Sequence, residues 1–231
     1  MRKLVYTNSG NIVKVHVRPI DWKYGNEYGI RARLTGECPA MFLSFGDGHG
    51  DGFCSWDFEG RHEYPKDTSQ SYIVELSVVC NNIIDYIEPC CGDCEYELVD
   101  FSNAPDILSA YIKHCNDIKL NNPQLKKLEL YILKSHEIDF SSCISLKELS
   151  IGCGENIKEL DLTNCLQLER LSVCGYSSKS LTNIKISNDC PLQYADLRGC
   201  KLHPGCISAI RRIVERNGGT FEDKEGRIYI I

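Results

Sequence analysis

Apolar residues separated by a single position recur at nearly constant spacing along residues 128–197, and most successive pairs begin 11 residues apart. Another apolar residue usually stands three positions before each pair. Because side chains alternate across a strand, each pair predicts a short strand with two side chains in the core and one on the surface. The pairs are Leu128-x-Leu130, Ile138-x-Phe140, Leu149-x-Ile151, Leu160-x-Leu162, Leu171-x-Val173, Ile184-x-Ile186 and Ala195-x-Leu197.

This pattern resembles the leucine-rich repeat, LxxLxLxxN/CxL, in a short form of roughly 22 residues. Cys143, Cys165 and Cys200 stand at the ninth position of the frame, and Cys190 follows it by one residue. The resemblance implies that these side chains face inward and help to satisfy backbone groups of the loop. Since one unit cannot bury its own apolar face, the units are expected to stack as a solenoid.

Each unit holds two half-repeats, so alternate strands are expected to share a sheet. Weaker matches at Ile84-x-Tyr86 and Val99-x-Phe101 extend the frame backward, and the repeat domain is therefore predicted to span 81–231. The pattern leaves the inverse assignment of the two sides open. We assign Ala110, Leu128, Leu149, Leu171 and Ala195 to the concave sheet and Ile118, Ile138, Leu160 and Ile184 to the convex side.

The segment after Cys200 predicts a helical cap. Residues 204–216 place Ile207, Ile210, Ile213 and Val214 on one helical stripe, and Asn217-Gly218-Gly219 predicts the end of the helix. Phe221 and residues 228–231 are expected to form a last strand. A terminal element with one polar side is what the open end of a solenoid requires.

Residues 1–80 carry a different pattern. Strands are predicted at 12–17, 30–34, 42–45 and 72–78, separated by turn-rich stretches, at a spacing typical of a β-sandwich. The segments 42–48 (FLSFGDG), 62–64 (HEY) and 71–78 (SYIVELSV) resemble the PKD domain in order and spacing. The expected fold is therefore mainly β with few helices: a PKD-like β-sandwich at 1–80, then the leucine-rich-repeat domain.

Charge and apolar runs narrow the functional classes. The net charge of -6 argues against nucleic acid as the main partner. No apolar run approaches the ~20 residues of a membrane helix, and no signal peptide follows Met1, so membrane insertion is not expected and the chain as written predicts a cytoplasmic location. A PKD-like domain followed by short leucine-rich repeats resembles a group of bacterial proteins, many of them on the cell surface. That resemblance implies adhesion or partner binding.

Fourteen cysteines could indicate a disulfide framework, but several recur at one repeat position, which favours buried free thiols; disulfides remain the alternative. The Cys90-Cys91-Gly-Asp-Cys94 segment, with His114 and Cys115 downstream, could instead form a zinc or redox site. Because His114 and Cys115 are adjacent on a predicted strand, they should point to opposite faces. A metal- or thiol-dependent protein is therefore the second hypothesis.

The glycine-rich segment 46–52 places Asp47, His49 and Asp51 at alternate positions, as calcium ligands of a loop would be. An EF-hand loop needs Glu at its twelfth position, where Phe58 stands, and prefers Asp or Asn over His at its third. A turn in which glycines adopt positive φ explains the segment better. We expect no metal and no cofactor.

No catalytic motif occurs in the chain, so the sequence predicts a non-enzymatic protein that binds a protein partner, or a glycan, through the concave face. Trp22, Trp56 and Tyr64 suggest, more weakly, a glycan site on the N-terminal sandwich. Asp196 is also expected to be exposed on the concave face. The oligomeric state is left open. The residues predicted to contact the partner are Tyr111, Lys113, Lys127, Glu129, Tyr131, Arg170, Tyr194 and Arg198.

Overall fold

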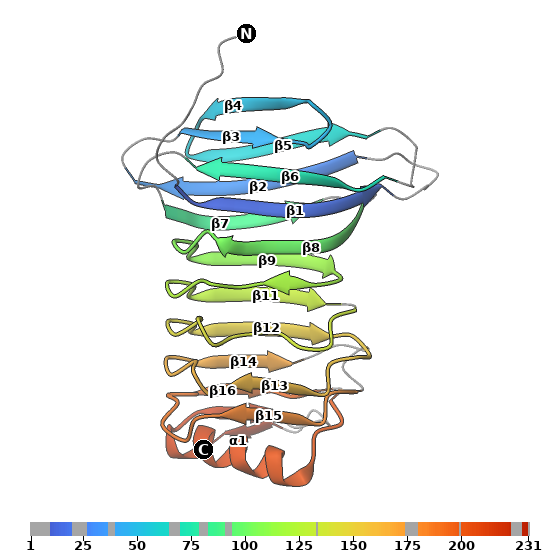
Figure 1. The fold of residues 1–231 in the computed structure, drawn as a ribbon. Coiled ribbons are helices and arrows are strands. Elements are labelled where there is room, and N and C mark those ends of the chain that lie inside the picture. The colour runs from blue at the N-terminus through green and yellow to red at the C-terminus, as the bar shows by residue number, and fades with distance from the viewer. Residues whose placement is uncertain are drawn as a thin grey trace.

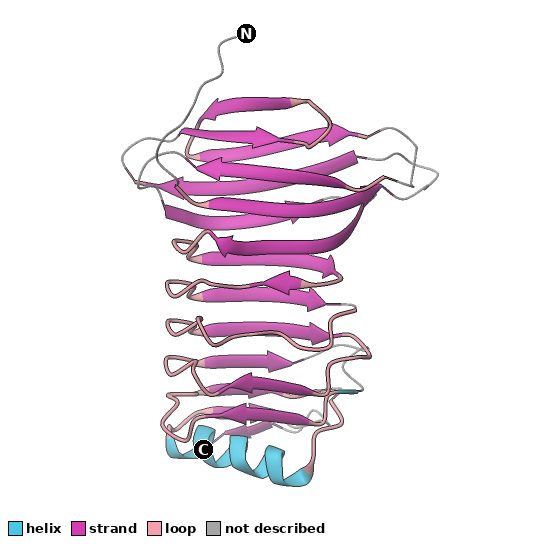
Figure 2. Ribbon diagram, in the orientation of Figure 1, coloured by secondary structure: helices cyan, strands magenta, loops and turns pink. Residues whose placement is uncertain are grey.

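The computed structural model describes residues 10–19, 27–36, 40–64, 70–78, 83–90, 94–132, 134–173, 180–198, 200–222 and 228–230. Within these ranges the chain is mainly β, as predicted, with one α-helix, α1 (Pro204–Arg216). The antiparallel strands of the N-terminal part lie at one end of the molecule and α1 at the other (Figures 1 and 2).

The N-terminal strands form two antiparallel layers. One layer has the order β8-β1-β6-β3-β4 and the other the order β7-β2-β5. The strands predicted at 12–17, 30–34, 42–45 and 72–78 are confirmed as β1, β2, β3 and β6. The eight strands are β1 (Ile12–Pro19), β2 (Glu27–Thr35), β3 (Ala40–Ser44), β4 (Gly50–Cys54), β5 (Asp57–Glu63), β6 (Tyr72–Val78), β7 (Ile83–Cys90) and β8 (Cys94–Asn103).

The two layers pack face to face over an apolar core. Alternate residues of β1 (Val13, Val15 and Val17) are fully buried, and the residues between them are half-buried. Gly60 of β5 lies so close to β3 that an added Cβ would stand 2.6 Å from Cδ2 of Leu43. A side chain at this position would require the Leu43 and Phe58 side chains to shift.

The glycine-rich segment 46–52 is part turn and part strand. Gly46 and Gly48 adopt φ of 85° and 96°, so the prediction that glycines supply positive φ in this turn is confirmed. The turn ends at His49, whose carbonyl oxygen accepts a hydrogen bond from the Phe45 N–H. The interpretation of the whole segment as a turn was wrong, because residues from Gly50 onward form β4 and pair with β3.

A ladder of parallel strands follows. In it Leu128 pairs in register with Ala110 and Leu149, and Leu171 pairs with Leu149 and Ala195. The predicted placement of these five residues in one sheet is therefore confirmed. The strands are β9 (Ser109–Cys115), β11 (Lys127–Ile132), β12 (Glu148–Cys153), β14 (Arg170–Val173), β16 (Tyr194–Asp196) and β17 (Thr220–Glu222).

A second set of strands lies on the other side of the core. There β13 (Glu159–Leu162) pairs with β15 (Asn183–Ile186), with Leu160 opposite Ile184, and the two strands run opposite to the ladder (Figure 1). The strand β10 (Ile118–Lys119) pairs with β8. The strand predicted at 138–140 was wrong: no strand is formed there, although Ile138 and Phe140 are both buried.

The antiparallel layers continue into the parallel part. Strand β7 pairs with β2 and with β9, while β8 pairs with β1, with β10 and, at its Tyr96, with β9. The parallel part is thus joined by hydrogen bonds to both N-terminal layers. Hydrogen-bonded strands connect the part before residue 80 with the part after residue 81. A domain boundary between these residues therefore stays a prediction.

The predicted C-terminal helix is confirmed. Ile210, Ile213 and Val214 are buried, and Ile207 packs partly against the core. Past the helix, Gly218 adopts φ of 66° and the chain continues into β17, which pairs with β18 (Ile228–Ile230). Helix α1 therefore closes the apolar interior that the last repeat strands would otherwise expose.

Candidate functional site

The outer face of β9, β11, β12, β14 and β16, called the ladder face below, collects most of the residues predicted to bind a partner. Because parallel strands in register point equivalent side chains to the same side, Lys127, Glu148, Arg170 and Tyr194 form one row across it. Tyr111 and Glu129 pair in the next row, and Tyr131 lies two residues beyond Glu129. The side chain of Lys113 lies outside the described residues.

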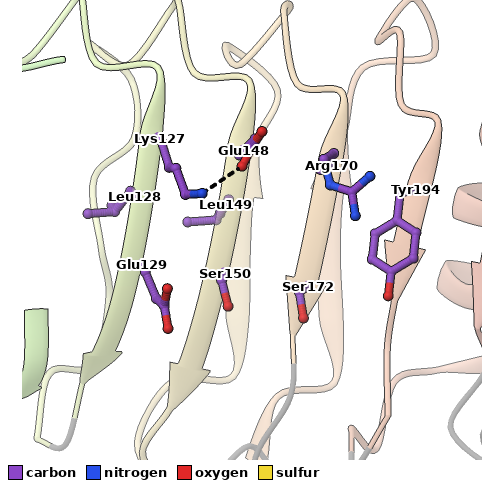
Figure 3. A pocket seen from close by; sticks show the side chains of 9 residues that line it. All are labelled: Lys127, Leu128, Glu129, Glu148, Leu149, Ser150, Arg170, Ser172 and Tyr194. Atoms are coloured by element: carbon purple, nitrogen blue, oxygen red, sulfur yellow. Dashed lines mark ion pairs between the residues drawn. The ribbon is translucent and has the colours of Figure 1, made fainter. Parts of the chain in front are cut away.

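A shallow groove of about 130 Å³ runs over this face (Figure 3). Ser150 and Ser172 occupy adjacent register positions in the middle of the ladder, where their short side chains leave space. Longer side chains, among them Glu129 and Tyr194, stand on either side. The groove is thus a direct consequence of which residue types fall on the outward positions. It is lined by Lys127, Leu128, Glu129, Glu148, Leu149, Ser150, Arg170, Ser172 and Tyr194.

The charges at the groove are not equally available. Lys127 Nζ lies 3.1 Å from a Glu148 carboxylate oxygen, so this lysine is already paired within the chain (Figure 3). Both side chains are about half exposed, and a pair of this kind contributes about 0–1 kcal/mol to stability.

Arg170 has different surroundings. Its guanidinium carbon lies 4.4 Å from the centroid of the Tyr194 ring, a cation–π contact. The Tyr194 hydroxyl donates to a Glu222 carboxylate oxygen at 3.3 Å, and burial, Asp196 and Glu222 all raise the pKa of Tyr194 above its usual value. The tyrosine therefore stays protonated and fixed as a platform for the exposed arginine.

Arg198, also predicted to contact the partner, is held by acidic groups of the chain. Its Nε and Nη2 donate to the two oxygens of Asp196 at 2.9 and 2.7 Å, and Nε lies 3.4 Å from Glu222. The prediction that Asp196 is exposed was wrong, because its side chain is only 3% exposed and is covered by Arg198. Its carboxylate also accepts from the Arg198 backbone N–H, which fixes the turn after β16.

The cysteines predicted to face inward at the ninth position of the frame are buried thiols. Cys143, Cys165 and Cys200 are buried as predicted, and Cys190 is buried as well. Burial raises the pKa of Cys143 to about 11 and that of Cys165 to about 12. These thiols are therefore unreactive at neutral pH. Cys91 and the side chains of Cys90, Cys94 and His114 lie outside the described residues, so the metal or thiol hypothesis stays a prediction.

Asn122 is a buried polar residue that was not predicted from the sequence. It is fully buried, and its Nδ2 donates to the carbonyl oxygens of Ala104 and Phe101. Asn122 precedes Leu125 by three residues, as Cys143 precedes Leu146. Counted from Ile118-x-Leu120, Asn122 stands one residue before the ninth repeat position, which takes Asn or Cys, and this near match was the signal that could have identified it.

The glycan site suggested for the N-terminal strands is not assembled by the described residues. Tyr64 is 2% exposed and its hydroxyl donates to the Phe45 carbonyl oxygen, so it packs inside and cannot stack on a sugar. Trp56 is partly exposed, and Trp22 lies outside the described residues.

Asp51, one of the three considered calcium ligands, lies on β4 and does not join Asp47 and His49. Instead, His62 of β5 lies beside Asp47 and His49. A search for ligands within one loop does not find His62, because it is distant in sequence.

Comparison with known protein families, curated proteins and solved structures finds no match to this chain. Among the described residues, no helix has both the length and the apolar character needed to cross a membrane.

Proposed function

We propose that the chain is a non-enzymatic recognition module, in which residues 81–231 form a leucine-rich-repeat solenoid behind a PKD-like β-sandwich. The in-register parallel strands and the buried Asn122, Cys143 and Cys165 support the repeat interpretation. The facing antiparallel layers and the glycine turn at 46–48 support the PKD-like interpretation.

The proposed binding surface is the ladder face, and its anchor is Arg170 on Tyr194. The observation that carries this assignment is the contrast among the cations there. Lys127 and Arg198 are engaged by acidic residues of the chain, whereas Arg170 forms no ion pair with any described residue. An exposed arginine held on an aromatic ring beside a groove is a typical binding hot spot.

The groove favours a protein segment with a carboxylate as the partner's contact. Arg170 offers a planar fork that binds a carboxylate through two hydrogen bonds. Ser150 offers a hydroxyl group to a backbone lying in the groove. Tyr194 is the one aromatic residue that lines the groove, and its ring is already occupied by Arg170, which makes a glycan the less favoured partner.

A peptide-display selection against the full-length chain tests the proposal. Selected peptides are expected to carry Asp or Glu, and Arg170→Ala should weaken their binding by about tenfold or more, equivalent to about 1.4 kcal/mol. Arg212→Ala, which removes an exposed arginine from α1, is the matched control and should leave the affinity unchanged. Tyr194→Phe keeps the ring under Arg170 and should bind nearly as wild type, whereas Tyr194→Ala should not.

Equal binding of the selected peptides by wild type and Arg170→Ala would show that the ladder face is not the site. If no peptide is selected, and the chain binds a glycan that Arg170→Ala does not bind, the partner would be a carbohydrate and not a protein.

A further inference from the structure

Asp47, His49 and His62 converge at the edge of the N-terminal layers, at the end remote from α1. The Phe45–His49 turn supplies the first two residues and β5 the third. His62 Nε2 lies 2.6 Å from one Asp47 carboxylate oxygen, and His49 Nδ1 lies 3.2 Å from the other. One donor atom from each residue can be chosen so that all three lie within 4.8 Å of one another.

The surroundings hold this arrangement in place. The His62 ring stacks on Phe45, with centroids 4.5 Å apart and planes 17° apart, and meets the Tyr64 ring edge-on at 4.7 Å. The Tyr64 hydroxyl donates to the Phe45 carbonyl oxygen, which ties the two aromatic walls together. His62 therefore has little rotational freedom, and its Nε2 is directed at Asp47.

The turn is fixed as firmly as the histidine. Gly46 has positive φ, and a Cβ on it would stand 2.6 Å from the Ile73 carbonyl oxygen, so the turn packs directly on β6. The His49 backbone N–H donates to Asp47 at 3.0 Å. Burial alone would raise the pKa of Asp47, but this bond and those from the two histidine rings hold it below its usual value. Asp47 is thus an oriented carboxylate at neutral pH.

Two imidazoles and one carboxylate are the donor set of a first-row transition-metal ion. Calcium and magnesium require mainly oxygen ligands, which this cluster does not provide. A tetrahedral zinc ion with bonds of about 2.0–2.1 Å separates its donor atoms by about 3.3 Å. The three donor atoms here lie within 4.8 Å of one another, so side-chain movements of about 1–2 Å would bring them to this spacing.

We propose that Asp47, His49 and His62 form a binding site for a divalent transition-metal ion of the zinc class. Asp47 and His62, each with a side chain 14% exposed, form the rigid inner part of the site, and His49, 75% exposed, closes it from the solvent side. The remaining coordination position faces water.

The test uses the full-length chain, freed of metal by a chelator and titrated with Zn²⁺ against a chromophoric competitor. His49→Ala should weaken binding by about tenfold or more, because it removes one of three ligands. This variant is informative because an exposed side chain contributes little to folding. His136→Ala and Asp51→Asn, an exposed histidine and a carboxylate on the neighbouring strand, are matched controls and should bind as wild type.

Cobalt(II) identifies the ligand class, since thiolate ligands add an intense near-ultraviolet charge-transfer band that imidazole and carboxylate ligands lack. We expect one equivalent of Co²⁺ with visible bands, no thiolate band, and loss of those bands in His49→Ala and His62→Gln. The Cys91→Ser/Cys94→Ser variant should give the same spectrum as wild type. Equal Zn²⁺ affinity of wild type and His49→Ala, or metal bound only with the thiolate band, would overturn the proposal.

Discussion

The Cys190 thiol donates a hydrogen bond to the carbonyl oxygen of Leu168 at 3.0 Å. Asn122 makes the same kind of contact at the start of the ladder, where its Nδ2 lies 2.7 Å from the carbonyl oxygen of Ala104. In both cases a buried polar side chain reaches one unit back and satisfies a loop carbonyl that no strand pairs. Two buried backbone oxygens of the turns thus receive their hydrogen bonds from side chains.

Asn122→Ala is expected to destabilise the chain by about 1–3 kcal/mol, because it leaves the Phe101 and Ala104 carbonyls buried without this donor. Urea unfolding measures the change as a lower midpoint at an unchanged slope. Asn121→Ala, at the exposed neighbouring position, is the control and should change stability by less than about 0.5 kcal/mol. Asn122→Cys retains a donor and should fall between the two; equal stability of Asn122→Ala and wild type would contradict the role given to the amide.

Thiol modification should separate the cysteines by burial. In the native chain at pH 8, iodoacetamide is expected to modify Cys54, which is exposed, and to spare Cys143 and Cys165. Burial raises the pKa of Cys153 to about 12, so this thiol should also stay unmodified. Peptide mass spectrometry reads each site, and labelling in denaturant is the positive control. Rapid native labelling of Cys165 would show that the core around it opens readily.

The periodic part of the fold was predictable from sequence because one physical constraint acts on every unit. Leu128, Leu149 and Leu171 must all face the same core, so their spacing alone placed them in register. Ile138 is buried like these leucines but does not lie in a strand. A side chain can be buried without its backbone being hydrogen-bonded to a neighbouring strand. Periodicity therefore predicts which side chains are inside more reliably than it predicts strands.

The site residues were harder to predict because neighbours in space decide their state. Nothing in the spacing distinguishes Arg170 from Arg198, yet one rests on Tyr194 and the other is bound by Asp196. His62 could be connected to Asp47 only once β5 was placed beside the turn. Such pairings arise from tertiary packing between segments and leave no local pattern.

Gly219 should tolerate no side chain, because an added Cβ would stand 2.0 Å from the Gln193 carbonyl oxygen. Gly219→Ala is expected to destabilise the chain by about 1–3 kcal/mol by pushing β17 away from β16. Gly205→Ala is the matched control: a Cβ there meets nothing within 4 Å, and alanine favours the helix, so stability should be unchanged or slightly higher. Thermal unfolding followed by circular dichroism distinguishes the two, and similar midpoints would contradict the close approach.

Glu95 should make the free energy of unfolding depend on pH in the acidic range. Hydrogen bonds from Asn116 and Lys134, at 2.6 and 2.5 Å, and the ion pair with Arg18 lower the pKa of Glu95 to about 2. The pKa of this carboxylate is lower in the folded chain than in the unfolded chain, where it is near 4.5. Ionised Glu95 therefore stabilises the fold at pH values above about 4.5. That contribution is lost as the pH falls from about 4.5 toward 2.

Glu95→Gln removes this dependence and is therefore the test. At pH 7 the variant should be less stable than wild type by about 1–2 kcal/mol, a value reduced for the solvent around Lys134 and Arg18. As the pH falls from 5 to 2 the two free energies of unfolding, measured with urea at each pH, should converge. Glu155→Gln, on an exposed turn, controls for the loss of one negative charge and should follow the wild-type curve. A constant gap between wild type and Glu95→Gln would mean that the cluster stabilises the fold by packing and not by its charge.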